Sequence, residues 1–166
     1  MKGRKDAKGW NDGERWARLA DLVLIIAREI QYRGYGDERA VSLTATEGMV
    51  MRYLQRHPVA QPNQIAAAVG LQRSNLSTLL RGLEAKGLLD RRTSPDDRRG
   101  VTVHLTERGV TNYAVVRRAW ARAVAKAAGN DTDNLDAALD LLGQIESGLI
   151  ETRPQEPVPG VLRLEH

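Results

Sequence analysis

The chain has 166 residues, the length of one compact domain or of one subunit in a small oligomer. Hydrophobic residues make up 42% and charged residues 28%, and the net charge of +4 permits a polyanionic partner without establishing one. The absence of cysteine excludes disulfides, thiolate nucleophiles and cysteine-based zinc sites.

Neither end of the chain predicts targeting to a membrane. The longest purely apolar run, Leu22 to Ala27, is far shorter than the roughly 20 residues of a membrane helix. Met1–Trp10 has basic residues but lacks the apolar stretch of a secretory signal, so we expect a cytoplasmic protein with no membrane partner. We expect a mobile basic arm at 1–12, one domain at 13–150, and a proline-containing tail at 151–166 whose Leu-Glu-His ending resembles a purification-tag junction.

The first half of the domain carries helical periodicity. Apolar residues recur every three to four positions between 14 and 33, which predicts a first helix. Thr44 followed by Glu47 forms a capping-box pair that begins a second helix, which Pro58 ends. Pro62 suits the first turn of a short third helix, which Gly70 terminates.

A leucine stripe (Leu76, Leu79, Leu80, Leu83) then predicts a fourth helix, and the period changes from helical to alternating. Val101 to Leu105 alternates as a half-buried strand does, and Leu88 to Arg92 is its expected partner across a polar turn. Thr106 caps a long helix that breaks at 130–133, and a last apolar helix follows. The acidic segment Asp131–Asp136 departs from a calcium loop at its fifth and sixth positions, so we interpret it as an N-cap with an acidic first turn.

Two short helices, a tight turn and a charged hairpin are the parts of a winged helix-turn-helix. With the leucine stripe inward, the outer face of the fourth helix carries arginines and hydroxyls and no carboxylate before Glu84, so it can approach a major groove without like-charge repulsion. Between Arg73 and Arg108 there are eight basic and five acidic residues, whereas Asp131 to Glu151 carries six acidic residues and no basic one. The positive part coincides with the expected DNA face.

The segment Gly87-Leu88-Leu89-Asp90-Arg91-Arg92-Thr93-Ser94-Pro95-Asp96-Asp97-Arg98-Arg99-Gly100-Val101, continued by Leu105-Thr106-Glu107-Arg108-Gly109, resembles the wing of MarR-type transcriptional regulators. The resemblance implies a mainly α dimer with a winged helix-turn-helix at 44–105, a small β-hairpin wing, and dimerisation helices at 14–33 and 106–150. It also implies that Arg99 enters the minor groove, that Asp97 braces the wing, and that Gln72 to Lys86 is the recognition helix. The usual serine-rich start of that helix is here Gln72-Arg73-Ser74-Asn75. The expected DNA-binding residues are Gln72, Arg73, Ser74, Asn75, Ser77, Thr78, Arg81, Arg98 and Arg99.

Aromatic and methionine side chains at core spacings would also line any cavity between the dimer arms and the DNA lobe, where family members often bind small aromatic anions. The candidate pocket residues are Trp16, Met49, Tyr53, Tyr113 and Trp120. We expect no metal and no cofactor. We also expect no enzymatic activity, because His57 and His104 have no recognisable catalytic partners and no phosphate-binding loop occurs.

The sequence therefore predicts a homodimeric, sequence-specific DNA-binding transcriptional regulator, a repressor that responds to a small organic ligand and binds a pseudo-palindromic operator. Two alternatives stay open. A non-specific architectural protein would bind all DNA sequences alike, with affinity set by salt. A winged-helix protein-interaction module would not retain DNA even at low salt.

Overall fold

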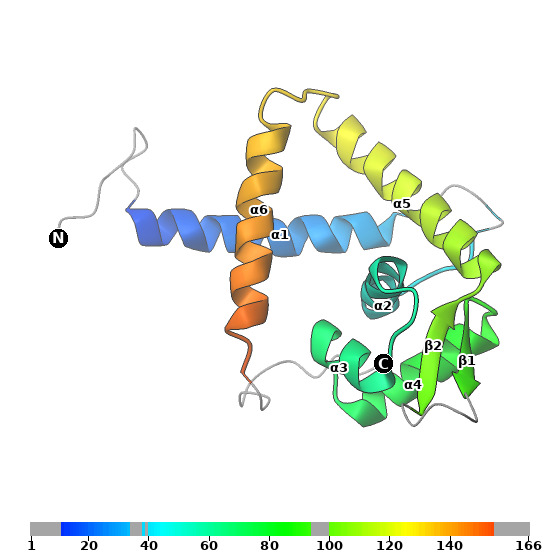
Figure 1. Ribbon diagram of the computed structural model, residues 1–166. Helices are drawn as coiled ribbons and strands as arrows, with labels where there is room; N and C mark the ends of the chain where they lie inside the picture. Colours follow the sequence, from blue (N-terminus) through cyan, green and yellow to red (C-terminus); the bar gives the residue numbers. More distant parts are fainter. Residues whose placement is uncertain (1–10, 34–37, 39, 94–99, 155–166) are drawn as a thin grey trace.

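A computed structural model describes residues 11–33, 38, 40–93 and 100–154 (Figure 1). The chain forms α1 (Asp12–Tyr32), α2 (Ala45–Arg56), α3 (Pro62–Val69), α4 (Arg73–Ala85), β1 (Leu89–Thr93), β2 (Val101–Leu105), α5 (Glu107–Ala127) and α6 (Leu135–Glu151). This order confirms the predicted mainly α fold with one small hairpin.

The expected caps of the central helices are confirmed. Thr44 and Glu47 each accept from the other's backbone N–H at the start of α2. Pro62 is the first residue of α3, and Gly70 ends that helix in the left-handed conformation, with φ of 72°. Thr106 accepts from the Gly109 N–H and caps α5.

Two helix starts differ from prediction. α1 begins at Asp12, because Asn11 forms a capping box with Glu14 that the hydrophobic pattern did not reveal. At the start of α6 the expected side-chain cap is wrong: Asn134 makes no capping hydrogen bond, and Asp131 accepts instead from the Asp133 N–H at 2.9 Å.

The hairpin is antiparallel, with Leu89 opposite Leu105 and Thr93 opposite Val101. Its first strand begins one residue later than predicted. Ala60, between α2 and α3, makes an isolated bridge to Val103, donating to its carbonyl and accepting from its N–H. The connection between α2 and α3 is thereby fastened to the wing.

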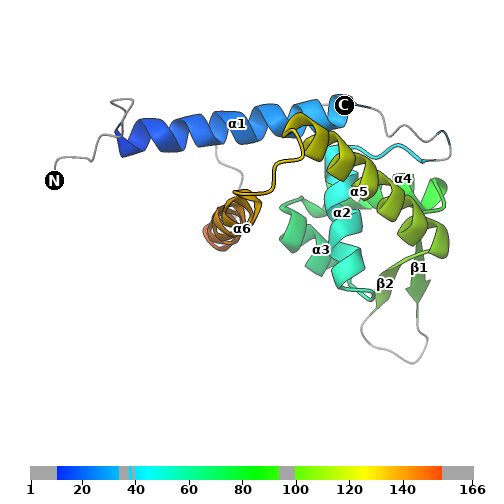
Figure 2. The ribbon, with the colours of Figure 1, turned by 90° about the horizontal axis from the view of Figure 1, so that it is seen from above.

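The hydrophobic core lies within the winged-helix lobe and includes the fully buried Leu54, Ile65, Leu80 and Val103. α5 enters this core through Tyr113 and Val116 and then runs away from the lobe toward the turn that precedes α6 (Figure 1). In the view from above, α1 and α6 lie outside the lobe (Figure 2).

α1 and α6 contain no buried residue among the described part of the chain. The face expected to pack inward from α1 is therefore uncovered in this single chain, where Leu22 to Ile26 are each 41–70% exposed.

α6 contacts the winged-helix lobe through its C-terminal half. Arg52 of α2 donates two hydrogen bonds, of 2.7 and 2.8 Å, to the Glu146 carboxylate. Just beyond α6, Arg153 donates to the carbonyls of Ala67 and Ala68 at the end of α3, where a cation satisfies orphan carbonyls. The start of the expected tail thus belongs to the packed structure.

Candidate nucleic-acid interface

α4 presents the predicted outer face to solvent. Leu76, Leu80 and Leu83 are buried on its inner side. Every residue predicted to contact DNA from this helix and its N-cap is exposed: Gln72, Arg73, Ser74, Asn75, Ser77, Thr78 and Arg81. Because the leucine side of α4 is buried in the core, its opposite side is exposed as a continuous polar surface.

Hydrogen bonds along this outer face fix the position of the Arg81 guanidinium. Thr78 donates through Oγ1 to the Ser74 carbonyl at 3.4 Å, and Arg81 donates through Nη2 to Thr78 Oγ1 at 3.2 Å. Arg81 therefore lies along the helix toward its N-terminal half. Glu84, the first carboxylate after Arg73, is 3.3 Å from Arg91 Nε, which compensates its negative charge.

β1 adds two arginines to the basic surface. Arg92 is paired with Asp90, Nη2 to Oδ2 at 3.1 Å. Arg91 lies opposite Val103, which is fully buried, so Arg91 is on the inward face of the hairpin. Its Nη2 is buried without a hydrogen-bond partner among the described residues, and its Nε has the ion pair with Glu84 but no hydrogen bond. Sequence analysis missed this residue, although the two-residue period of a strand places it on the face of Leu89 and Thr93.

A pocket of about 210 Å³ lies between α3, α4 and β1. Leu76, Leu80 and Pro62 provide apolar walls, and polar or charged groups complete the lining: Asn63, Arg73, Ser77 and Arg91. Two of these, Arg73 and Ser77, are predicted DNA contacts. The pocket therefore opens beside the expected DNA surface, away from the cleft in which sequence analysis placed a ligand.

The predicted wing-tip residues Asp97, Arg98 and Arg99 lie outside the described residues. β1 and β2, which carry that tip, are described, and Figure 1 shows them at the edge of the lobe beside α4. The roles of the three residues stay predictions.

The five candidate ligand residues are only partly brought together. Tyr113 is buried, and Trp120 packs against the core beside Gly48, two turns further along α5. Tyr53 is half-buried and stacks on the His57 ring at a centroid distance of 4.3 Å. Met49 and Trp16 are 47% and 57% exposed.

Tyr113 lies in a positive environment. Burial raises the pKa of its phenol, and the charges of Arg117, Arg52 and Arg56 lower that pKa in part. The hydroxyl therefore stays protonated at neutral pH and can donate to an anion. These three arginines come from α2 and α5.

The described part of the chain offers neither of two other classes of site, a metal centre and a membrane-spanning helix. No cluster of three or more histidine, aspartate or glutamate side chains there could hold a metal ion. No described helix is both long and apolar enough to cross a membrane.

Comparison with known proteins identifies this arrangement. Residues 41–100, from the linker before α2 to the residue before β2, match the model of the MarR family. This match agrees with the resemblance of the wing segment. The relatives that match are described as transcriptional regulators, in agreement with the expectation that the chain is not an enzyme.

A curated relative of this chain is the putative transcriptional regulatory protein for the hcr operon of Thauera aromatica. It is 33% identical over 89 residues, which cover 50% of this chain and 54% of the relative. The chain thus matches about half the length of that relative.

Solved structures share the winged-helix fold over most of the chain. The transcriptional regulator BldR from Sulfolobus solfataricus has a TM-score of 0.65 at 21% identity and covers 84% of this chain and 99% of its own. FabT from Streptococcus pneumoniae, solved in complex with DNA, has a TM-score of 0.60 at 23% identity and covers 84% of this chain and 94% of its own.

Proposed function

We propose that this protein is a homodimeric, sequence-specific DNA-binding transcriptional regulator of the MarR family, a repressor that responds to a small organic anion. One observation carries the proposal: the exposed face of α4 offers arginine and hydroxyl groups, and Glu84 is compensated by Arg91. Such donors fit phosphate oxygens and the base edges of a major groove. The DNA complex of FabT, which has the same fold, supports this choice of partner.

A selection of bound fragments from a random DNA pool, at stated salt, tests the proposal. We expect enrichment of a pseudo-palindrome whose half-site centres are about 34 Å apart, one turn of DNA. Retention of all fragments alike would favour an architectural protein, and no retention at low salt would favour a protein-interaction module.

The uncovered faces of α1 and α6 support the homodimer. α1 is apolar around most of its circumference in its middle turns, from Leu22 to Ile26. α6 exposes a second set of large apolar residues: Leu135, Leu139, Leu141, Leu142, Leu149 and Ile150. Apolar surface of this extent on a globular chain favours association, and a second copy offers complementary helices through two-fold symmetry.

The environment of Tyr113 supports an anionic ligand. A protonated phenol beside positive charges from Arg56 and Arg117 suits a planar aromatic carboxylate. We expect such a molecule to release DNA and to quench the fluorescence of Trp120, which lies on the same helix. Peroxide or zinc should do neither, because the chain has no cysteine. Peroxide-driven release that a thiol reductant reverses would contradict this mode of control.

A further inference from the structure

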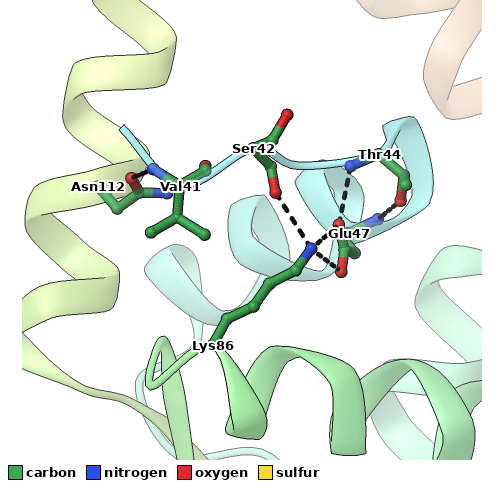
Figure 3. A network of polar contacts seen from close by, with 6 residues as sticks. All are labelled: Val41, Ser42, Thr44, Glu47, Lys86 and Asn112. Carbon is green, nitrogen blue, oxygen red and sulfur yellow. Dashed lines mark hydrogen bonds and ion pairs between the residues drawn. The ribbon is translucent and has the colours of Figure 1, made fainter. Parts of the chain in front are cut away.

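The C-terminal end of α4 is tied to two segments that lie far from it in sequence (Figure 3). The ammonium of Lys86, at the C-cap of α4, donates to both oxygens of Glu47 at 2.7 and 2.8 Å and to the Ser42 carbonyl at 3.1 Å. Glu47 is 7% exposed and stands in the first turn of α2, whereas Ser42 belongs to the linker that comes from α1. One cation thus joins the recognition helix to α2 and to that linker.

The same linker is fastened to α5. Asn112, which is 6% exposed, accepts from the Val41 N–H at 2.7 Å and donates to the Val41 carbonyl at 3.1 Å. Val41 adjoins Ser42, so the linker is held from one side by α5 and from the other by Lys86. A continuous set of polar contacts therefore runs from α5 through the linker to the end of α4.

Glu47 has two tasks in this network. Its Oε2 accepts from the Thr44 N–H at 2.8 Å, which completes the cap of α2, and the same carboxylate binds Lys86. The capping task needs only an acceptor oxygen, which glutamine also has. Pairing with Lys86 needs the negative charge, so the two tasks can be separated by a single substitution.

The length of α4 determines how far its N-terminal end moves when the helix tilts at Lys86. Its 13 residues span about 20 Å, at about 1.5 Å per residue, between Lys86 and the N-terminal end that carries the predicted base contacts. A tilt of about 10° at the Lys86 end would move the other end by about 3.5 Å, close to one base-pair step of DNA, about 3.4 Å.

We propose that the Glu47–Lys86 pair is a positioning device that holds α4 at the angle required for one half-site spacing. The inference rests on the proposed DNA-binding function. It adds that two residues outside the DNA-contacting face set the preferred spacing of the half-sites. Glu47 and Lys86 are positioning residues: they act through the angle of α4 and touch no base.

The test measures affinity for the selected operator and for versions with one base pair added or removed between the half-sites, at one salt concentration. The proteins are the wild type, Glu47→Gln, Lys86→Met and the double variant. Lys126→Met, which removes an exposed lysine from the last turn of α5, is the matched control. Circular dichroism checks the fold of each.

We expect the wild type and Lys126→Met to discriminate against altered spacing by about tenfold or more per base pair, the usual cost of a mismatched position. Glu47→Gln and Lys86→Met should each reduce that discrimination to about threefold or less, and the double variant should lose no more than either alone, since both substitutions break one interaction. A merely structural role would lower the folded fraction, which weakens binding to every operator by the same factor and leaves the ratio unchanged.

Glu47→Gln keeps the cap of α2, so the test does not depend on Lys86→Met being stable. An unchanged ratio in Glu47→Gln, beside clear discrimination by the wild type, would overturn this inference alone. Failure of the wild type to select any operator would overturn the proposed function and the inference together.

Discussion

Gly109, in the first turn of α5, lies close to the backbone of Leu88, the residue before β1. A Cβ added at Gly109 would overlap the carbonyl oxygen of Leu88. That carbonyl accepts from the Thr106 N–H, and the Leu88 N–H donates to the Leu83 carbonyl, so the backbone is fixed at the start of β1. Glycine is therefore required here because a side chain has no space, and not because of backbone conformation, since φ of Gly109 is outside the left-handed region.

Gly109→Ala should therefore lower the free energy of unfolding by about 3 kcal/mol, since neither backbone can yield easily. Gly82→Ala is the matched control: it lies in α4 with open space around it, and it should raise the free energy by up to about 1 kcal/mol through helix propensity. Urea unfolding at one protein concentration measures both. Equal effects of the two substitutions would contradict the steric explanation.

We expect Arg81, which donates a hydrogen bond to Thr78 Oγ1, to contact mainly phosphate. Arg81→Ala should weaken binding to all sequences alike and reduce the slope of log affinity against log salt by about one unit. Substitution of exposed Ser77 should instead change the preferred base at one operator position. Fluorescence anisotropy over a salt series distinguishes the two outcomes, and a sequence-dependent loss in Arg81→Ala would assign it to base contact.

At the scale of the elements, the Arg52–Glu146 pair joins α6 to α2. The hydrogen bond from Arg52 lowers the pKa of Glu146 below its ordinary value of 4.5. A carboxyl whose pKa is lowered by folding stabilises the fold above the unfolded pKa and ceases to do so as pH falls through the folded value. The contribution is therefore complete at neutral pH and begins to decline as pH falls below about 4.5, toward the lowered pKa of the folded state.

Glu146→Gln should consequently lower the free energy of unfolding by about 0.5 kcal/mol at pH 7, a small value because both side chains are nearly half exposed. At pH 3 the wild type and the variant should converge, and about 1 M salt should reduce the difference at pH 7. Chemical denaturation at the two pH values is the measurement. A difference that grows on acidification would show that the carboxylate does not act through Arg52.

At the scale of the whole molecule, the proposed homodimer would cover the exposed apolar middle of α1. Ile26, 50% exposed, belongs to this surface. Ile26→Glu should shift the dimer to monomers at micromolar concentration, because a charge cannot be buried unpaired at an apolar interface. Sedimentation velocity checks this, with Arg28→Gln as the control, because Arg28 is exposed and lies on the opposite side of the same helix from Ile26. A wild-type chain that is a folded monomer at micromolar concentration would contradict the homodimer itself.

Much of the fold follows from local rules that the sequence alone expresses. The capping of α2 and α5, the proline at the start of α3, the glycine at its end and the alternation of β2 depend on residues at most four apart. The outer face of α4 is likewise determined by the leucine stripe, since burial of one side exposes the other. These features, and the family resemblance of the wing, were predictable without coordinates.

Only the tertiary structure decided which distant groups meet. Lys86 and Glu47 are 39 positions apart, Arg153 and Ala67 are 86 apart, and Arg52 and Glu146 are 94 apart. No helical or strand period relates such positions, because their contact depends on how complete elements pack. Local patterning therefore determined the elements and the exposed face of α4 that we propose binds DNA, whereas packing alone determined what holds that face in place.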